Sequence, residues 1–179
     1  MGESRRTKMT KRLLKDSLLE QLRDKPIGKV SVTAICAGAD VNRSTFYAYY
    51  EDVTALLEEI ENDVFEHMPQ INDMSGIQQN KEFLHLNIRF FDYIRDNVTA
   101  FRVLLLDSQS SSFHDRMLKK LYEMYLNNIA QGGNDELRTR LRYVYIANGA
   151  LGMLKEWIEL DFPVGSREFA NLIMDIASY

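Results

Sequence analysis

The helical spacing of apolar residues runs through almost the whole chain and is the feature that most constrains its fold. Leu14, Leu18 and Leu22 recur every four residues, which places them on one face of a helix. No window shows the sustained alternation of apolar and polar residues that a half-buried strand requires. The sequence therefore predicts an all-α protein.

Helix-breaking residues divide this pattern into segments. Pro26 and Gly28 end a first helix, and the pair Gly132-Gly133 separates two long later helices. We expect helices over about residues 7–24, 32–38, 43–50, 83–94, 100–106, 113–130 and 136–160, one after residue 52, and a last one after residue 165. The side chains expected to cap helix N-termini are those of Ser31, Asn42, Asp52 and Ser166.

The two ends of the chain differ in charge. The first 50 residues hold ten Lys and Arg against five Asp and Glu, a net charge of +5, whereas the other residues carry a net charge of −9. A basic head on an acidic body indicates that the head contacts a polyanion, although a solvated basic tail would have the same composition. Cys36 is the single cysteine, and no apolar run approaches the ~20 residues needed to span a bilayer. We therefore expect a cytoplasmic protein with no membrane segment.

Two short predicted helices joined by a tight link at residues 38–41 describe a helix-turn-helix, whose second helix fits the DNA major groove. The stretch SVTAICAGADVNRSTFYAYY at residues 31–50, followed by Asp52 and Leu56, resembles the DNA-binding signature of the TetR/AcrR family of transcriptional regulators. The resemblance implies a three-helix helix-turn-helix DNA-binding domain over residues 1–52. It also implies a helical ligand-binding and dimerisation domain over residues 53–179.

The later part of the chain resembles one branch of this family, which contains regulators of dihydroxyacetone kinase operons. The similarity lies in residues 91–94, 101–105 and 149–157. The family architecture implies a homodimer formed through the last two helices, and Gly149 and Gly152 would allow the close approach of two helices. Ordinary packing within one chain is the alternative for this apolar segment.

The resemblance also implies which residues contact DNA. Arg43 and Ser44 fall where the family reads base edges, and Arg suits bidentate contact with guanine. Thr45, Tyr47 and Tyr49 fall where its members usually contact phosphates, so Tyr47→Phe should weaken binding more evenly across DNA sequences than Arg43→Ala. Thr33, Asn42 and Lys8 complete the expected contact set, and Lys11 and Arg12 could flank the DNA backbone.

Two residues depart from the family pattern. Asp40 stands where the family usually has a turn glycine, and Asp accepts left-handed backbone geometry better than most residues. Val53 stands where most members carry a Lys that helps to hold a phosphate, and the loss of that Lys would weaken nonspecific affinity for DNA.

Other chemistry finds little support in the sequence. His67, His85 and His114 are scattered without metal-ligand spacing, and no phosphate loop or nucleophile elbow is present. We therefore expect no catalytic activity, no cofactor and no bound metal. Aromatic and Met residues of the C-terminal part could line a cavity for a small-molecule effector, although such a stripe is more often plain core.

The prediction is a ligand-responsive homodimeric repressor that binds a pseudo-palindromic double-stranded DNA operator. One alternative is a co-activator of the same fold that acts through a protein partner instead of binding operator DNA. A second alternative is a small-molecule-binding helical protein with no DNA role.

Overall fold

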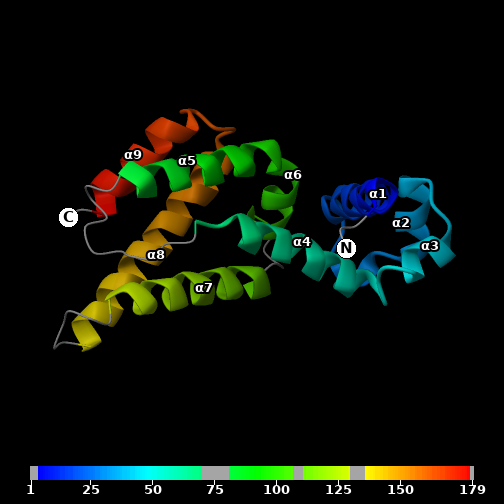
Figure 1. The fold of residues 1–179 in the computed structure, drawn as a ribbon, viewed down its shortest axis with the longest axis horizontal. Helices are drawn as coiled ribbons and strands as arrows, with labels where there is room; N and C mark the ends of the chain where they lie inside the picture. The colour runs from blue at the N-terminus through cyan, green and yellow to red at the C-terminus, as the bar shows by residue number, and fades with distance from the viewer. Residues whose placement is uncertain (1–3, 70–80, 107–110, 130–135, 178–179) are drawn as a thin grey trace. The chain divides into compact units, whose positions relative to one another are not determined.

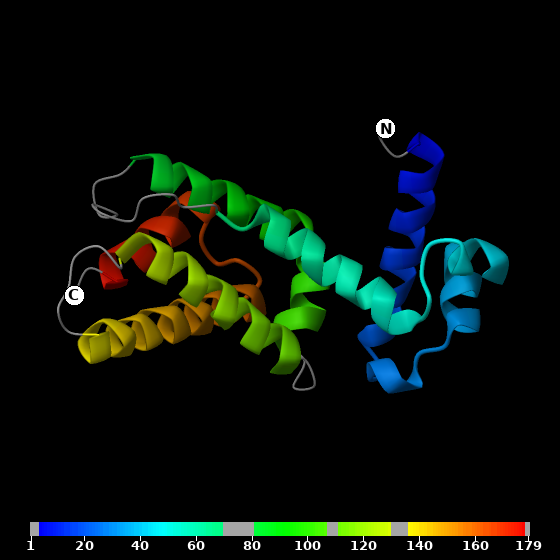
Figure 2. The ribbon, with the colours of Figure 1, turned by 60° about the horizontal axis from the view of Figure 1, so that its bottom comes forward.

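The computed structural model describes residues 4–69, 81–106, 111–129 and 136–177, and every regular element in these ranges is a helix (Figures 1 and 2). This confirms the all-α prediction. The chain divides into two compact units, Met1–Glu66 and His67–Tyr179. This division keeps nearly all of the fourth helix with the first unit, and a functional boundary after residue 52 stays a prediction. Most of the expected loop at 69–80 and the Gly132-Gly133 break lie outside the described residues.

The first unit contains the predicted helix-turn-helix. Its elements are α1 (Arg5–Leu22), a 3₁₀ turn η1 (Ile27–Lys29), α2 (Val32–Ala39), α3 (Arg43–Tyr47) and α4 (Val53–His67). Ser31 caps α2 by accepting a hydrogen bond from the Ala34 amide, and Asp52 accepts one from the Ala55 amide at the start of α4. Both predicted caps are therefore confirmed.

The core of the first unit is apolar and well covered. Leu14, Leu18 and Leu22 are buried, as their spacing predicts, and they share this core with Ile35 and Phe46. The first helix begins two residues earlier than expected because the Ser4 hydroxyl accepts a hydrogen bond from the Thr7 amide and caps it. Burial of this apolar face is the main force that holds the helices of the unit together.

The third helix is shorter than the sequence pattern indicates. It ends at Tyr47 instead of Tyr50, because the amides of Tyr49 and Tyr50 both donate to the Phe46 carbonyl and close the chain into a turn. Asn42 precedes the helix, but its side chain makes no capping hydrogen bond, so that part of the prediction is wrong. Tyr50 is nevertheless buried, because the turn directs its ring back into the core.

The second unit is a bundle of longer helices. Its elements are α5 (Lys81–Asp96), α6 (Val98–Phe101), the π-helical segment η3 (Arg102–Leu106), α7 (Ser111–Ile129), α8 (Glu136–Glu159) and α9 (Ser166–Ala177). Figures 1 and 2 show α5 beside α9 and α7 beside α8. Tyr143 on α8 donates a 2.6 Å hydrogen bond to the Leu118 carbonyl on α7, and burial raises the pKa of Tyr143 to about 12.

Aromatic side chains join three helices of the second unit. The Trp157 ring on α8 stacks on the Phe169 ring on α9, with centroids 4.3 Å apart, and Phe91 on α5 packs edge-on against both. The Trp157 indole also donates to the Val164 carbonyl in the connection between α8 and α9. This cluster therefore orients the last helix against α5 and α8.

The last helix differs from its prediction at its N-terminus. Ser166 is its first residue and is buried, while the Gly165 carbonyl accepts the first helical hydrogen bond, so Ser166 does not cap the helix. Phe169 is buried, whereas Leu172 and Ile176 on the same helix are exposed. The apolar stripe of α9 is thus wider than the surface that α5 and α8 cover.

Candidate nucleic-acid interface

The turn between α2 and α3 depends on a left-handed residue. Asp40 has φ 52° and ψ 47°, which bears out the expectation that Asp can replace a turn glycine here. The Val41 amide donates to the Cys36 carbonyl, and this bond closes the end of α2. The turn sets the direction in which α3 leaves α2.

The third helix has one buried and one exposed side. Phe46 is fully buried, while Arg43 and Ser44 are exposed and Tyr47 is 51% exposed. Large aromatic residues normally bury more of their surface than Tyr47 does. The exposed side therefore presents a cation, a hydroxyl and a phenol, which are groups that bind DNA bases and phosphates.

Arg43 and Tyr47 contact each other one helical turn apart. Arg43 Nη2 donates to the Tyr47 hydroxyl across 3.4 Å, and the guanidinium carbon lies 5.9 Å from the centre of the Tyr47 ring. The hydrogen bond to Tyr47 raises the pKa of Arg43. Helical spacing places the two residues on one face of α3, and the structure shows that their side chains are in contact.

The other expected DNA-contacting residues lie on the surface of the same unit, with one exception. Thr33 is exposed near the start of α2, Asn42 is exposed before α3, and Lys8 is exposed on α1. Tyr49 is 36% exposed after α3. Thr45 is the exception, because its side chain is half-buried and is therefore less accessible than those of the other residues.

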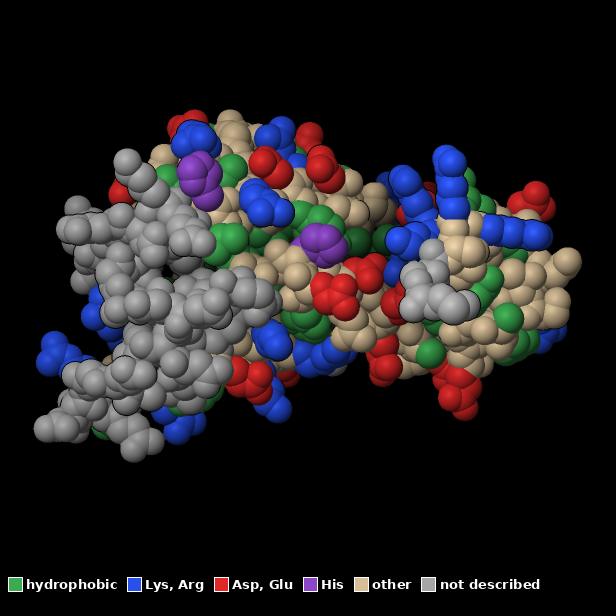
Figure 3. All heavy atoms as spheres, in the orientation of Figure 1, with side chains coloured by type: hydrophobic (Ala, Val, Ile, Leu, Met, Phe, Trp, Pro, Cys, Tyr) green, Lys and Arg blue, Asp and Glu red, His purple; other side chains and the backbone are tan. Residues whose placement is uncertain are grey.

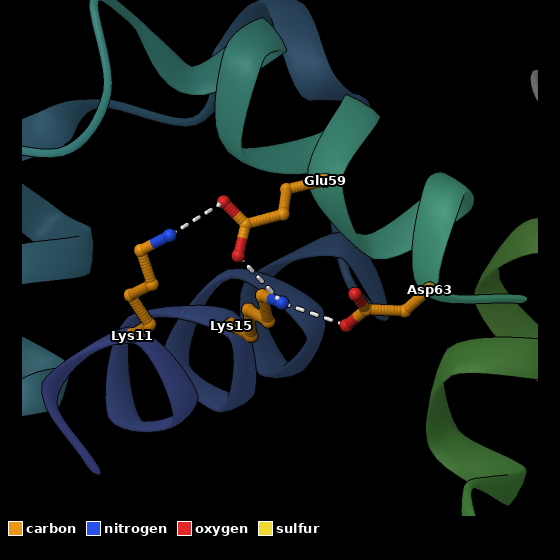
Figure 4. Close-up of polar contacts among 4 residues, drawn as sticks. All are labelled: Lys11, Lys15, Glu59 and Asp63. Carbon is orange, nitrogen blue, oxygen red and sulfur yellow. Dashed lines mark hydrogen bonds and ion pairs between the residues drawn. The ribbon is translucent and has the colours of Figure 1, made fainter. Parts of the chain in front are cut away.

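Two lysines of α1 pair with two carboxylates of α4 (Figure 4). Lys15 Nζ lies 2.8 Å from Glu59 Oε1 and 2.6 Å from Asp63 Oδ2, and Lys11 Nζ lies 3.2 Å from Glu59 Oε2. Burial alone would raise the pKa of Glu59, but the hydrogen bonds and charges of Lys15 and Lys11 lower it overall. We call these four residues the α1–α4 clasp.

Not all basic residues of the first helix face solvent as free cations, because the clasp pairs Lys11 and Lys15 with carboxylates of α4. Lys11 forms an ion pair with Glu59. Its Nζ also lies 6.0 Å from the centroid of the Tyr49 ring and 5.8 Å from that of Tyr50, within the range of a cation–π contact. Arg12 is exposed, with Asp16 at 3.8 Å one turn away. Figure 3 shows Lys and Arg side chains gathered around α1. The sequence shows that the two lysines, like the two carboxylates, are four residues apart. It does not show that the lysines contact the carboxylates.

Other reactive groups are accounted for by local structure. The Cys36 thiol is buried and burial raises its pKa, which does not suit a redox sensor. Burial and the charge of Lys155 lower the pKa of His114, whose Nδ1 lies 3.3 Å from Lys155 Nζ. Within the described ranges, no three His, Cys, Asp or Glu side chains gather as metal ligands. Within the same ranges, no helix is both long enough and apolar enough to cross a membrane.

Residues 81–179 match a TetR family described as "Transcriptional regulator C-terminal region". The match covers more than half of the chain and lies within the second helical unit. The chain therefore belongs to the TetR family of transcriptional regulators. Among curated proteins, none matches this sequence.

Solved structures share the fold at low sequence identity. The structure titled "Dihydroxyacetone kinase operon activator DhaS" is 17% identical with a TM-score of 0.63, and the match covers 94% of each chain. A TetR-family regulator from Streptomyces coelicolor is 15% identical with a TM-score of 0.64, covering 99% of this chain and 81% of that one. The fatty acid degradation regulator FadR from Bacillus halodurans is 13% identical with a TM-score of 0.65, covering 99% and 96%.

Proposed function

We propose that this regulator binds a pseudo-palindromic DNA operator as a homodimer, with α3 as the recognition helix. The exposed side of α3 carries the proposal, because Arg43, Ser44 and Tyr47 face solvent while Phe46 fixes the helix to the core. Arg43 and Ser44 read base edges, while Thr45, Tyr47 and Tyr49 bind phosphates. Thr33, Asn42 and Lys8 add contacts at the edges of this surface. The DNA-binding domain of this proposal comprises residues 1–52.

The dimer forms through α8 and α9. Four large apolar side chains of α8 recur at helical spacing and are exposed, as are two on α9: Leu137, Leu141, Val144, Tyr145, Leu172 and Ile176. Large contiguous apolar patches on a protein surface often mark sites where another molecule binds. A second copy that covers both helices would bury them in a two-fold interface.

The dimer must place two recognition helices about 34–36 Å apart to enter successive major grooves. A small-molecule effector bound to the second unit favours a different separation and so lowers operator affinity. The chain then acts as a ligand-responsive repressor in the cytoplasm, without catalysis or a cofactor.

Selection of bound DNA from a random pool by the full-length protein tests this function, followed by affinity measurements across a salt series. We expect an inverted repeat and a steep loss of affinity with salt, because phosphate contacts release counterions. Binding that enriches no sequence and varies little with salt would contradict the proposal.

One observation favours a second candidate, a co-activator that works through a protein partner. Val53, at the start of α4, has an apolar side chain where most family members have a Lys for phosphate. The DhaS structure is titled an operon activator. If this candidate is correct, the selection from random DNA enriches no sequence. The protein then binds a protein partner with an affinity that depends little on salt.

A further inference from the structure

The contact between Arg43 and Tyr47 links base reading to the core of the first unit. Tyr47 packs edge-on against the fully buried Phe46, with ring centroids 5.6 Å apart and planes at 85°. Its hydroxyl in turn accepts a 3.4 Å hydrogen bond from Arg43 Nη2. The position of the guanidinium is therefore tied through one phenol ring to a residue that cannot move independently of the domain.

The chemistry of both groups allows this contact to persist on DNA. A phenol accepts and donates at the same time, so a hydroxyl that accepts from Arg43 still has its own proton for a phosphate oxygen. A guanidinium has five N–H donors, so one bond to Tyr47 leaves the others for guanine O6 and N7. Restricting a long side chain before binding also reduces the entropy that it loses on binding.

We propose that Tyr47 is a positioning residue for Arg43, so that its hydroxyl sets base specificity as well as affinity. The family resemblance implies a phosphate contact for Tyr47, and such a contact carries no information about the DNA sequence. This inference rests on the proposed function, in which α3 reads an operator. It differs from that function in predicting how Tyr47 and Arg43 depend on each other.

The test measures the affinity of wild type, Tyr47→Phe, Arg43→Ala and the double variant for three DNAs. These are the selected operator, the operator with the Arg43-dependent base pair changed, and random DNA. We expect Tyr47→Phe to lower operator affinity about three- to tenfold more than random-DNA affinity. In the Arg43→Ala background, this excess loss should disappear, because the positioned group is absent.

Tyr49→Phe is the matched control, because Tyr49 is an exposed tyrosine whose ring lies against Tyr50 and Lys11 rather than an arginine. It should weaken all three DNAs by a similar factor. Tyr47→Phe keeps the ring that packs on Phe46, and unchanged circular dichroism and thermal midpoint would verify that the domain is intact.

An equal loss on all three DNAs, or full additivity with Arg43→Ala, would show that the Tyr47 hydroxyl contacts phosphate alone and would overturn the inference. Failure of the proposed function is seen separately, in a wild-type protein that selects no operator, and it would overturn both proposals.

Discussion

The hydroxyl of Ser17 occupies the space that a side chain on Gly38 would need. Ser17 on α1 is buried and donates a 2.9 Å hydrogen bond to the Ile35 carbonyl on α2. A Cβ built on Gly38 would collide with Ser17 Oγ, but it would lie at an ordinary 3.4 Å from Ser17 Cβ. The first two helices of the first unit therefore approach closely at a point where Gly38 has no side chain.

This relationship predicts that the effect of Gly38→Ala on the free energy of unfolding depends on the residue at position 17. Gly38→Ala alone should lower the free energy of unfolding by about 1 kcal/mol, because overpacking outweighs the gain in helix propensity. In a Ser17→Ala background the same change should be neutral or stabilising, since the clashing oxygen is gone. Urea unfolding of the four proteins measures both steps. A Gly38→Ala effect that is the same in both backgrounds would rule out this explanation.

The α1–α4 clasp predicts a specific dependence of stability on acid. The folded pKa of Glu59 lies below its ordinary value of 4.5, so its pairing stabilises the protein above that pH and is lost as pH falls through the folded pKa. Glu59→Gln should cost about 0.2–1 kcal/mol at pH 7, typical of partly exposed pairs, and much less at pH 3. Urea midpoints between pH 3 and 7 measure the difference.

Glu58→Gln is the control for the clasp, because Glu58 is exposed on the same helix. It should leave the shape of the pH profile close to that of wild type. A Glu59→Gln profile that runs parallel to wild type from pH 7 to pH 3 would mean that the clasp does not stabilise the fold.

Arg43→Ala should weaken binding to the selected operator by about 1–3 kcal/mol and relax specificity at one base pair. The reason is the loss of bidentate hydrogen bonds that only guanine accepts in that geometry. Competition binding against operators changed at each position measures the effect. Lys8→Ala is the comparison, and it should weaken all sequences alike and reduce the salt slope by about one. If Arg43→Ala gave equal losses on operator and random DNA, Arg43 would not read bases.

The exposed apolar run on α8 predicts that charge there separates the dimer. Leu141→Glu and Tyr145→Glu should each raise the dimer dissociation constant about tenfold or more, because a carboxylate would be buried at the interface. Sedimentation velocity over a concentration series measures this. The thermal midpoint of the monomer should change little, since both side chains are already exposed within one chain.

Arg142→Glu is the control, because it introduces the same carboxylate at an exposed position outside the apolar run. A monomeric wild type, or an equal effect of Arg142→Glu, would contradict this interface.

Much of the local structure was predictable because its causes are local. Ser31 and Asp52 cap helices through amides three residues ahead, and Asp40 adopts its left-handed conformation within a four-residue turn. The leucines of α1 are buried because helical spacing places them on one side. The exposed side of α3, with Arg43 and Tyr47, also follows from spacing once Phe46 is assigned to the core.

By itself, the sequence determined the helical elements, their order and the residue types that α3 presents to solvent, because these depend on neighbours within a few positions. Only the tertiary structure decided that Lys11 and Lys15 meet Glu59, 48 or 44 residues further along the chain, and that Ser17 meets Gly38. It also decided which apolar residues of α9 remain exposed. Such contacts depend on how helices pack, and helical spacing shows that a face is apolar without showing what covers it.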